Sequence, residues 1–172
     1  MSARPHSGLL ATAILLAAAA GCCPATTTVL LVRHAEKGLG SDPDLTPEGR
    51  QRAQALVAIG RQAGVVAAFH TQYKRSAQTA QPLAADLGIP MIQVDYTPGQ
   101  EAAHAEALVR AVLAAYAGKV VLVVGHTTTL PVIMEKLGVR SLPAMPETQY
   151  GDLFVIIRTG TEGTLVPGRF GP

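Results

Sequence analysis

Apolar and polar positions alternate along this chain in blocks rather than residue by residue. Short continuous runs of Val, Leu, Ile and Ala are followed by longer segments whose apolar residues recur every three or four positions. The runs predict strands buried on both faces, and the longer segments predict amphipathic helices. The expected strands are residues 28–32, 65–69, 91–94, 119–125 and 151–158, with a further edge strand within 160–167. The expected helices are residues 47–63, 73–87, 101–117 and 128–137.

The helix boundaries carry their own signals. Thr46 and Pro47 stand where an N-cap and a first helical residue belong, because threonine accepts from free N–H groups and proline lacks one. Gly64 and Gly88 follow the first two helices, and glycine readily takes the left-handed conformation that ends a helix. Strands that alternate with such helices predict a three-layer α/β/α sandwich with a mainly parallel central sheet.

The N-terminal residues lie outside this alternation. The uncharged run at residues 9–20 is too short to span a membrane as a helix, which takes about 20 apolar residues. Its length and composition fit the hydrophobic region of a secretory signal. Small residues then lead to Cys22, a pattern that resembles a bacterial lipobox, in which this cysteine is lipidated. We expect a signal peptide at 1–21, a tether at 22–27 and one domain at 28–172, exported and anchored as a lipoprotein of the cell envelope. The alternatives are an ordinary cleaved signal and an uncleaved anchor.

Composition narrows the classes of function. The chain has 172 residues, of which 48% are hydrophobic and 15% charged, enough for one packed domain. The formal net charge is +2 and no basic run occurs, which argues against nucleic-acid binding. Only 4% of residues are aromatic and none is tryptophan, so we do not expect a site that stacks bases or sugars. The pattern indicates no particular oligomeric state.

Chemically active side chains follow the apolar runs at three places. Arg33 and His34 end the first run, Arg75 follows the second at the start of a helix, and His126 and Thr127 follow the run at 119–125. Ligands of parallel α/β folds bind at the carboxyl ends of the strands, so we expect these side chains to lie together. Arginine forks and the free N–H groups of helix N-termini both suit phosphate. The sequence therefore predicts a site for a small phosphate-bearing dianion.

A histidine held rigidly at the end of a strand can also act as a nucleophile. A neutral imidazole attacks phosphorus, and water then hydrolyses the phosphohistidine. Arginines around the phosphoryl group stabilise its equatorial charge while the bond breaks. This chemistry makes His34 the candidate nucleophile.

Four segments resemble motifs of the histidine phosphatase superfamily, the phosphoglycerate-mutase-like proteins that include the small phosphohistidine phosphatases. These segments are 32–36 (VRHAE), 45–53 (LTPEGRQRA), 71–80 (TQYKRSAQTA) and 123–126 (VVGH). The resemblance implies a phosphoglycerate-mutase-like fold and a metal-independent phosphatase without a cofactor. Its partner would be a small phosphorylated substrate or a phosphoprotein. The segment after Arg33 and His34 lacks the asparagine of the mutases, which favours a phosphatase over a mutase.

The resemblance also implies roles for single residues. His34 would be the nucleophile, and Arg33, Arg75, His126 and Thr127 would bind the phosphate. No clear motif marks the general acid, for which Glu101 is the first candidate and Asp95 the second. If the site has no acid, a phosphoramidate becomes the better substrate, because its leaving nitrogen takes up a proton readily. The alternative function is a non-catalytic envelope lipoprotein that binds phosphate or a phosphorylated ligand.

For the remaining polar residues near these segments, the sequence predicts less specific roles. We expect His70 to be structural, His104 to face solvent, and Glu36 to orient the loop after His34. A metal site built from His34, Glu36, His70 and His126 is disfavoured, because two arginines would repel a divalent cation. We therefore expect no metal.

Overall fold

The computed structural model describes residues 25–146 and 148–171. The expected signal peptide and the lipidation site at Cys22 lie outside these residues. The strands are β1 (Thr26–Arg33), β2 (Val65–His70), β3 (Met91–Gln93), β4 (Val120–Gly125), β5 (Asp152–Thr159) and β6 (Glu162–Arg169). The helices are α1 (Pro47–Ala63), α2 (Lys74–Leu87), α3 (Glu101–Tyr116) and α4 (Thr129–Lys136). Each expected element is present, with ends that differ by no more than two residues.

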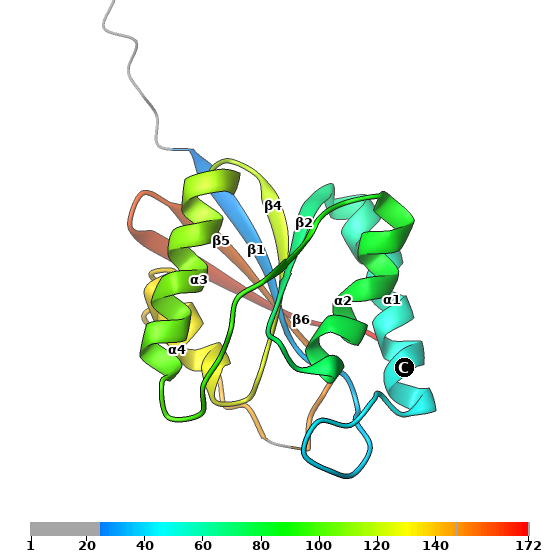
Figure 1. Cartoon of the computed structure of the whole chain (residues 1–172). Coiled ribbons are helices and arrows are strands. Elements are labelled where there is room, and N and C mark those ends of the chain that lie inside the picture. Colours follow the sequence, from blue (N-terminus) through cyan, green and yellow to red (C-terminus); the bar gives the residue numbers. More distant parts are fainter. Residues whose placement is uncertain (1–24, 147, 172) are drawn as a thin grey trace, which may run out of the picture.

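The strands form one sheet in the order β3-β2-β4-β1-β5-β6. The first four of these are parallel to one another, and β5 and β6 are antiparallel additions at one edge. Helices α1 and α2 cover one face of the sheet, and α3 and α4 cover the other (Figure 1). The predicted three-layer α/β/α sandwich with a mainly parallel sheet is therefore confirmed.

The apolar run of β1 is explained by burial on both faces of the sheet. Val29 and Leu31 pack in the cluster that includes residues of α3 and α4. Leu30 and Val32 point the other way and pack with residues of α1 and α2. Because side chains alternate along a strand, a strand between two helical layers needs apolar residues at successive positions.

The first strand begins earlier than the sequence pattern indicates. Thr26 and Thr27, which we expected in the tether, belong to β1 and pair with Thr159 and Arg158 of β5. The hydroxyl oxygen of Thr27 also accepts a hydrogen bond from the N–H of Gly118 at 3.0 Å. The apolar pattern does not predict this pairing, because Thr26 and Thr27 are polar. Their place in the strand depends on β5 lying beside them.

Helix α1 fixes the loop that follows His34. Its N-cap Thr46 accepts from the N–H of Gly49 at 3.1 Å and donates its own N–H to the carbonyl of Glu36 at 2.9 Å. A Cβ atom at Gly49 would overlap that carbonyl oxygen of Glu36, so only glycine lets the helix approach the loop this closely. Close packing against the loop therefore explains why the segment at 45–53 has a glycine at position 49.

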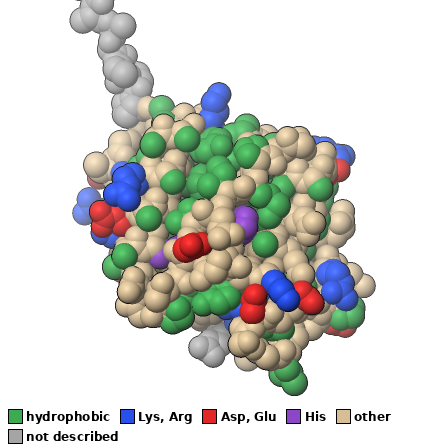
Figure 2. Space-filling model, in the orientation of Figure 1, with side chains coloured by type: hydrophobic (Ala, Val, Ile, Leu, Met, Phe, Trp, Pro, Cys, Tyr) green, Lys and Arg blue, Asp and Glu red, His purple; other side chains and the backbone are tan. Residues whose placement is uncertain are grey.

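Two surface features complete the description of the fold. No helix among the described residues is both long and apolar enough to cross a membrane. On the face shown in Figure 2, basic and acidic side chains lie near one another instead of forming a field of one sign.

Candidate active site

A cavity of about 280 Å³ opens at the carboxyl ends of β1 and β4, near the start of α2. These strand ends lie at the lower side of Figure 1. Its lining residues are Arg33, His34, Tyr73, Arg75, Tyr96, Pro98, His126, Thr127 and Thr128. Arg33, His34, Arg75, His126 and Thr127, expected from the sequence to lie together, are all in this group. They meet because the parallel strands end at the same side of the sheet.

His34 is held by its backbone and by one ring nitrogen. Its N–H donates to the carbonyl of Gly125 at 3.0 Å, which continues the β1–β4 pairing past the strand. Its Nδ1 lies 2.9 Å from the carbonyl oxygen of Ala35. A carbonyl only accepts, so Nδ1 carries the proton and Nε2 keeps its lone pair. The side chain is 3% exposed, so this orientation is enclosed by protein.

Both histidines of the cavity are neutral at pH 7. Burial lowers the pKa of His34 from 6.5 to about 4, and repulsion from Arg33, Arg75 and Lys37 acts in the same direction. Burial likewise lowers the pKa of His126 to about 3, with repulsion from His34 and Arg75 added. The lone pair of His34 is therefore available as a nucleophile.

His126 is fixed beside His34 by two threonines. Its Nε2 lies 2.9 Å from the hydroxyl oxygen of Thr71, and its backbone N–H donates to the hydroxyl of Thr129 at 2.9 Å. The centroids of the His34 and His126 rings are 5.3 Å apart. The two imidazoles thus line the same cavity from two neighbouring strands, β1 and β4.

Arg75 lies in the first turn of α2 and has an unmet hydrogen-bonding capacity. Its Nε is buried and has no hydrogen-bond partner among the residues that the structure describes. Its Nη1 is 3.8 Å from a carboxylate oxygen of Asp42, which also accepts the N–H of Lys74 at 3.0 Å. An oxyanion such as phosphate can accept a hydrogen bond from a guanidinium nitrogen of this kind.

Solved structures share this fold. The protein histidine phosphatase SixA complexed with tungstate has 18% identity and a TM-score of 0.67, over 84% of this chain and 97% of that one. YhfR of Bacillus stearothermophilus has 20% identity and a TM-score of 0.66, over 81% and 95%. SixA of Nakamurella multipartitia has 25% identity and a TM-score of 0.60, over 87% and 98%. No curated protein sequence matches the chain.

The family model "Histidine phosphatase superfamily (branch 1)" matches residues 29–99, which include Arg33, His34 and Arg75. Over these residues the chain is similar to the histidine phosphatase superfamily, and its fold is that of solved structures that include histidine phosphatases. This similarity supports phosphatase activity, and phosphohistidine phosphatases are among the solved structures that share the fold.

The two candidate general acids stand apart from the cavity. Glu101 accepts hydrogen bonds from the Tyr96 hydroxyl at 2.7 Å and from the N–H of Gly99 at 3.1 Å. The bond from Tyr96, together with backbone N–H bonds, lowers the pKa of Glu101. Asp95 is exposed, and its carboxylate accepts from Gln93 at 2.8 Å. Neither lines the cavity, and no carboxylate does among the described residues.

The other candidate residues lie behind or beside the cavity. The expectation that His104 faces solvent was wrong, because its ring is buried 5.4 Å from that of Tyr96. His70 is also buried, with Nδ1 2.7 Å from the carbonyl oxygen of Thr71. Glu36 forms an ion pair with Arg52 at 2.7 Å. Within residues 25–146 and 148–171, no group of three or more His, Cys, Asp or Glu side chains could hold a metal ion.

Sequence reasoning missed the tyrosines of the site. Low aromatic content argues only against a site that stacks bases or sugars, and three of the four tyrosines gather around the cavity or its arginines. The position of Tyr96 is a usable signal, because it lies shortly after the third strand and the residues of the cavity come from positions just past strand ends. Tyr73 stands inside a motif segment, and Tyr150 comes just before the fifth strand, where a loop could close the pocket.

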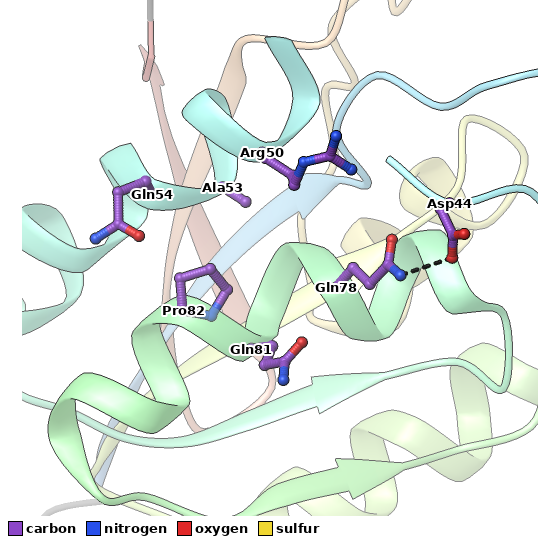
Figure 3. A pocket seen from close by; sticks show the side chains of 7 residues that line it. All are labelled: Asp44, Arg50, Ala53, Gln54, Gln78, Gln81 and Pro82. Carbon is purple, nitrogen blue, oxygen red and sulfur yellow. Dashed lines mark hydrogen bonds between the residues drawn. The ribbon is translucent and has the colours of Figure 1, made fainter. Parts of the chain in front are cut away.

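A second cavity, of about 460 Å³, lies between α1 and α2 (Figure 3). It is lined by Asp44, Arg50, Ala53, Gln54, Gln78, Gln81 and Pro82. Gln78 donates to Asp44 and accepts from the N–H of Leu45, both at 2.8 Å, and Arg50 donates to the carbonyl of Leu45 at 2.6 Å. These groups hold the loop before α1, which explains why polar side chains gather in this groove.

Proposed function

We propose that this phosphatase hydrolyses a phosphomonoester or phosphoramidate through a phosphohistidine on His34, without a metal ion. The observation that carries the proposal is the unprotonated Nε2 of a buried histidine in a cavity lined by Arg33, Arg75 and His126. The buried Nε of Arg75, which has no acceptor among the described residues, supports an anionic substrate.

The reaction has two displacement steps. In the first, Nε2 of His34 attacks phosphorus, an N–P bond forms, and the bond from phosphorus to the leaving group breaks with its electron pair. In the second, water attacks phosphorus, the N–P bond breaks, and phosphate leaves while the water proton is released. Arg33 and Arg75 stabilise the phosphoryl oxygens in both steps, because their charge is fixed in place before the reaction. His126 lies beside them and assists as a positioned neutral group.

The leaving group needs little protonation by this enzyme. No carboxylic acid among the described residues lines the cavity, and His126, with a pKa of about 3, is not an imidazolium at neutral pH and so is a poor proton donor. An alkoxide leaves poorly without a proton donor, whereas a phenolate or an imidazole nitrogen leaves more readily. We therefore place phosphoramidates and activated esters ahead of simple sugar phosphates as substrates.

The test is hydrolysis of p-nitrophenyl phosphate by the chain from Ala25 onward, with EDTA present. His34→Asn keeps a donor near the position of Nδ1 and removes the nucleophile. His70→Asn is the matched control, because His70 also donates Nδ1 to a neighbouring carbonyl but does not line the cavity. We expect turnover in the wild type and in His70→Asn, and a loss of about 10⁴-fold or more in His34→Asn.

Rapid acid-free quenching with labelled substrate provides a second measurement. An acid-labile, alkali-stable phosphoprotein that is absent from His34→Asn supports the covalent intermediate. Phosphate binding without hydrolysis of any activated ester would favour the alternative, a non-catalytic phosphate-binding protein. Turnover that EDTA abolishes would contradict the metal-independent mechanism.

We also propose that the chain is exported and lipidated at Cys22. The uncharged run at residues 9–20 and the small residues before Cys22 support this localisation. Strand β1 starts at the end of the sheet opposite the cavity, and its eight residues span about 26 Å. An anchored protein would therefore present its cavity away from the membrane. Fractionation tests the proposal: Cys22→Ser should move the protein from the membrane to the soluble fraction, and an unchanged distribution would contradict it.

A further inference from the structure

Three of the side chains assigned above to phosphate binding each lie against a tyrosine. The pairs are Arg33 with Tyr150 (4.1 Å from guanidinium carbon to ring centroid), Arg75 with Tyr73 (4.2 Å) and His126 with Tyr96 (5.3 Å between ring centroids, 28° between planes). The fourth tyrosine of the chain, Tyr116, packs edge-on against Phe69 instead. We propose that Tyr73, Tyr96 and Tyr150 are positioning residues that hold the three partners in their phosphate-binding orientation. The proposal rests on the function proposed above.

An aromatic face is a suitable support for an arginine that must bind an anion. It attracts the guanidinium through its quadrupole and matches its flat shape. A carboxylate would also hold the arginine, but its negative charge would repel the phosphate. Arginine loses rotamer freedom when it is fixed on a ligand, so a ring that orients it beforehand reduces this loss. Tyr73 and Tyr150 therefore orient Arg75 and Arg33 without cancelling their charge.

The hydroxyls of Tyr73 and Tyr150 contribute little to this support. Neither hydroxyl has a hydrogen-bond partner among residues 25–146 and 148–171. Their contacts with the arginines run through the ring faces. Phenylalanine should therefore replace either tyrosine with little effect on phosphate binding.

Tyr96 is different, because its hydroxyl is part of the support. The hydroxyl donates to Glu101 at 2.7 Å and lies 3.0 Å from the hydroxyl oxygen of Thr128. Its backbone N–H and carbonyl are both bonded to the side chain of Gln72, at 2.9 and 2.7 Å. The ring, packed on His126, is thus held from the loop after β2, the start of α3 and the start of α4. Glu101 acts through Tyr96 in this arrangement and not as the proton donor.

The experiment compares Tyr→Phe and Tyr→Leu variants at positions 73, 96 and 150 of the protein. Three quantities are measured: kcat and KM for p-nitrophenyl phosphate, the Kd of inorganic phosphate by calorimetry, and the melting temperature. Tyr116→Phe and Tyr116→Leu are the matched controls, because Tyr116 is a tyrosine of the same domain that packs away from the cavity.

Tyr73→Leu and Tyr150→Leu should each raise KM and the Kd of phosphate by about 3- to 10-fold, the size expected for a cation–π contact. Their Phe variants should stay within about twofold of the wild type, because the ring face remains. Tyr96→Leu should lower kcat by about tenfold, because His126 loses its orientation in the transition state. Tyr96→Phe should lose part of that amount. The Tyr116 variants should change only the melting temperature.

Two results would overturn the proposal. One is folded Leu variants at positions 73, 96 and 150 with unchanged kcat, KM and phosphate Kd. The other is a Phe variant at 73 or 150 that loses as much as the Leu variant, since the ring would then not be the reason. If the wild type shows no His34-dependent turnover, the proposed function fails, while the phosphate Kd still decides the positioning roles. If the wild type binds no phosphate, both fail.

Discussion

The cavity at the strand ends and the groove between α1 and α2 differ in how far their polar groups satisfy one another. The groove between α1 and α2 is the larger, at about 460 Å³ against about 280 Å³ for the cavity at the strand ends. In the groove, Asp44 and Arg50 both make hydrogen bonds within the loop and helices around them. At the strand ends, two arginines and two neutral histidines face one opening, and the Nε of Arg75 has no acceptor among the described residues.

This difference shows that volume is a poor guide to the reactive site. A polar groove forms wherever two helices splay around a loop that needs its own hydrogen bonds. Gathering several buried arginines and histidines in one cavity is costly, and such clusters persist where a ligand compensates them. The smaller cavity therefore holds the functional groups, and substitutions should separate the two regions clearly.

The largest contrast is expected between two arginines. Arg75→Leu should lower kcat/KM by about 10²- to 10³-fold, because it removes a positioned charge from the phosphoryl oxygens. Arg50→Leu, in the groove, should leave kcat/KM within twofold and lower the free energy of unfolding by about 1 kcal/mol, through its bond to Leu45. Steady-state kinetics and urea unfolding of both variants check this. Equal losses of activity would remove the distinction between the cavities.

Acid should destabilise the protein through the histidine cavity. The pKa values of His34 and His126 are about 4 and about 3 when folded, against 6.5 in the unfolded chain. The unfolded chain therefore binds more protons below pH 6.5, and stability falls as the pH drops towards 4. The loss should be on the order of 5 kcal/mol between pH 7 and pH 4.5, about half from each histidine.

The measurement is urea unfolding at these two pH values for the wild type, His34→Asn and Gln81→Ala. His34→Asn should reduce the pH dependence, because one of the titrating groups is gone. Gln81→Ala, in the groove, should leave it unchanged. A wild-type stability that does not fall between pH 7 and pH 4.5 would show that these histidines are not held neutral.

Gly49 joins the two regions, since it lies on the helix that borders the groove and touches the loop after His34. Gly49→Ala should destabilise the protein by about 1–3 kcal/mol, because the added Cβ overlaps the carbonyl of Glu36. It should also lower kcat/KM, because the turn that orients His34 shifts. Gln51→Ala, at an exposed position of the same helix, is the control. Denaturation and kinetics that are equal for both variants would contradict this packing role.

The smallest effect concerns the acidic residues of the loop before α1. Asp42→Asn removes the negative charge 3.8 Å from Arg75 and should tighten phosphate binding by about 2- to 5-fold. The gain should shrink at high salt. Asp44→Asn, which alters only the groove, should not change the phosphate Kd. Calorimetry at two salt concentrations distinguishes these outcomes, and weaker binding by Asp42→Asn would show that this carboxylate positions Arg75 more than it repels the ligand.

Most of the fold could be read from local patterns. The apolar runs predict the strands because each strand has a helical layer on both sides, and Thr46, Pro47 and Gly64 mark the limits of α1. The site residues Arg33, His34, Arg75 and His126 could be found because parallel strands end at one side of the sheet. These inferences depend on neighbours in the sequence or on a general rule of the fold.

Only the tertiary structure decided the surroundings of those residues. Thr71 meets His126 across 55 positions of sequence, and this contact depends on β2 lying beside β4. The direction of Glu101, the burial of His104 and the place of each tyrosine depend likewise on which loops meet at the strand ends. The sequence by itself determined the elements and the nucleophile candidate, because those signals are local. The order of the strands decided which side chains surround the site residues. Contacts between distant segments produce no periodic pattern in the sequence, so they could not be predicted from it.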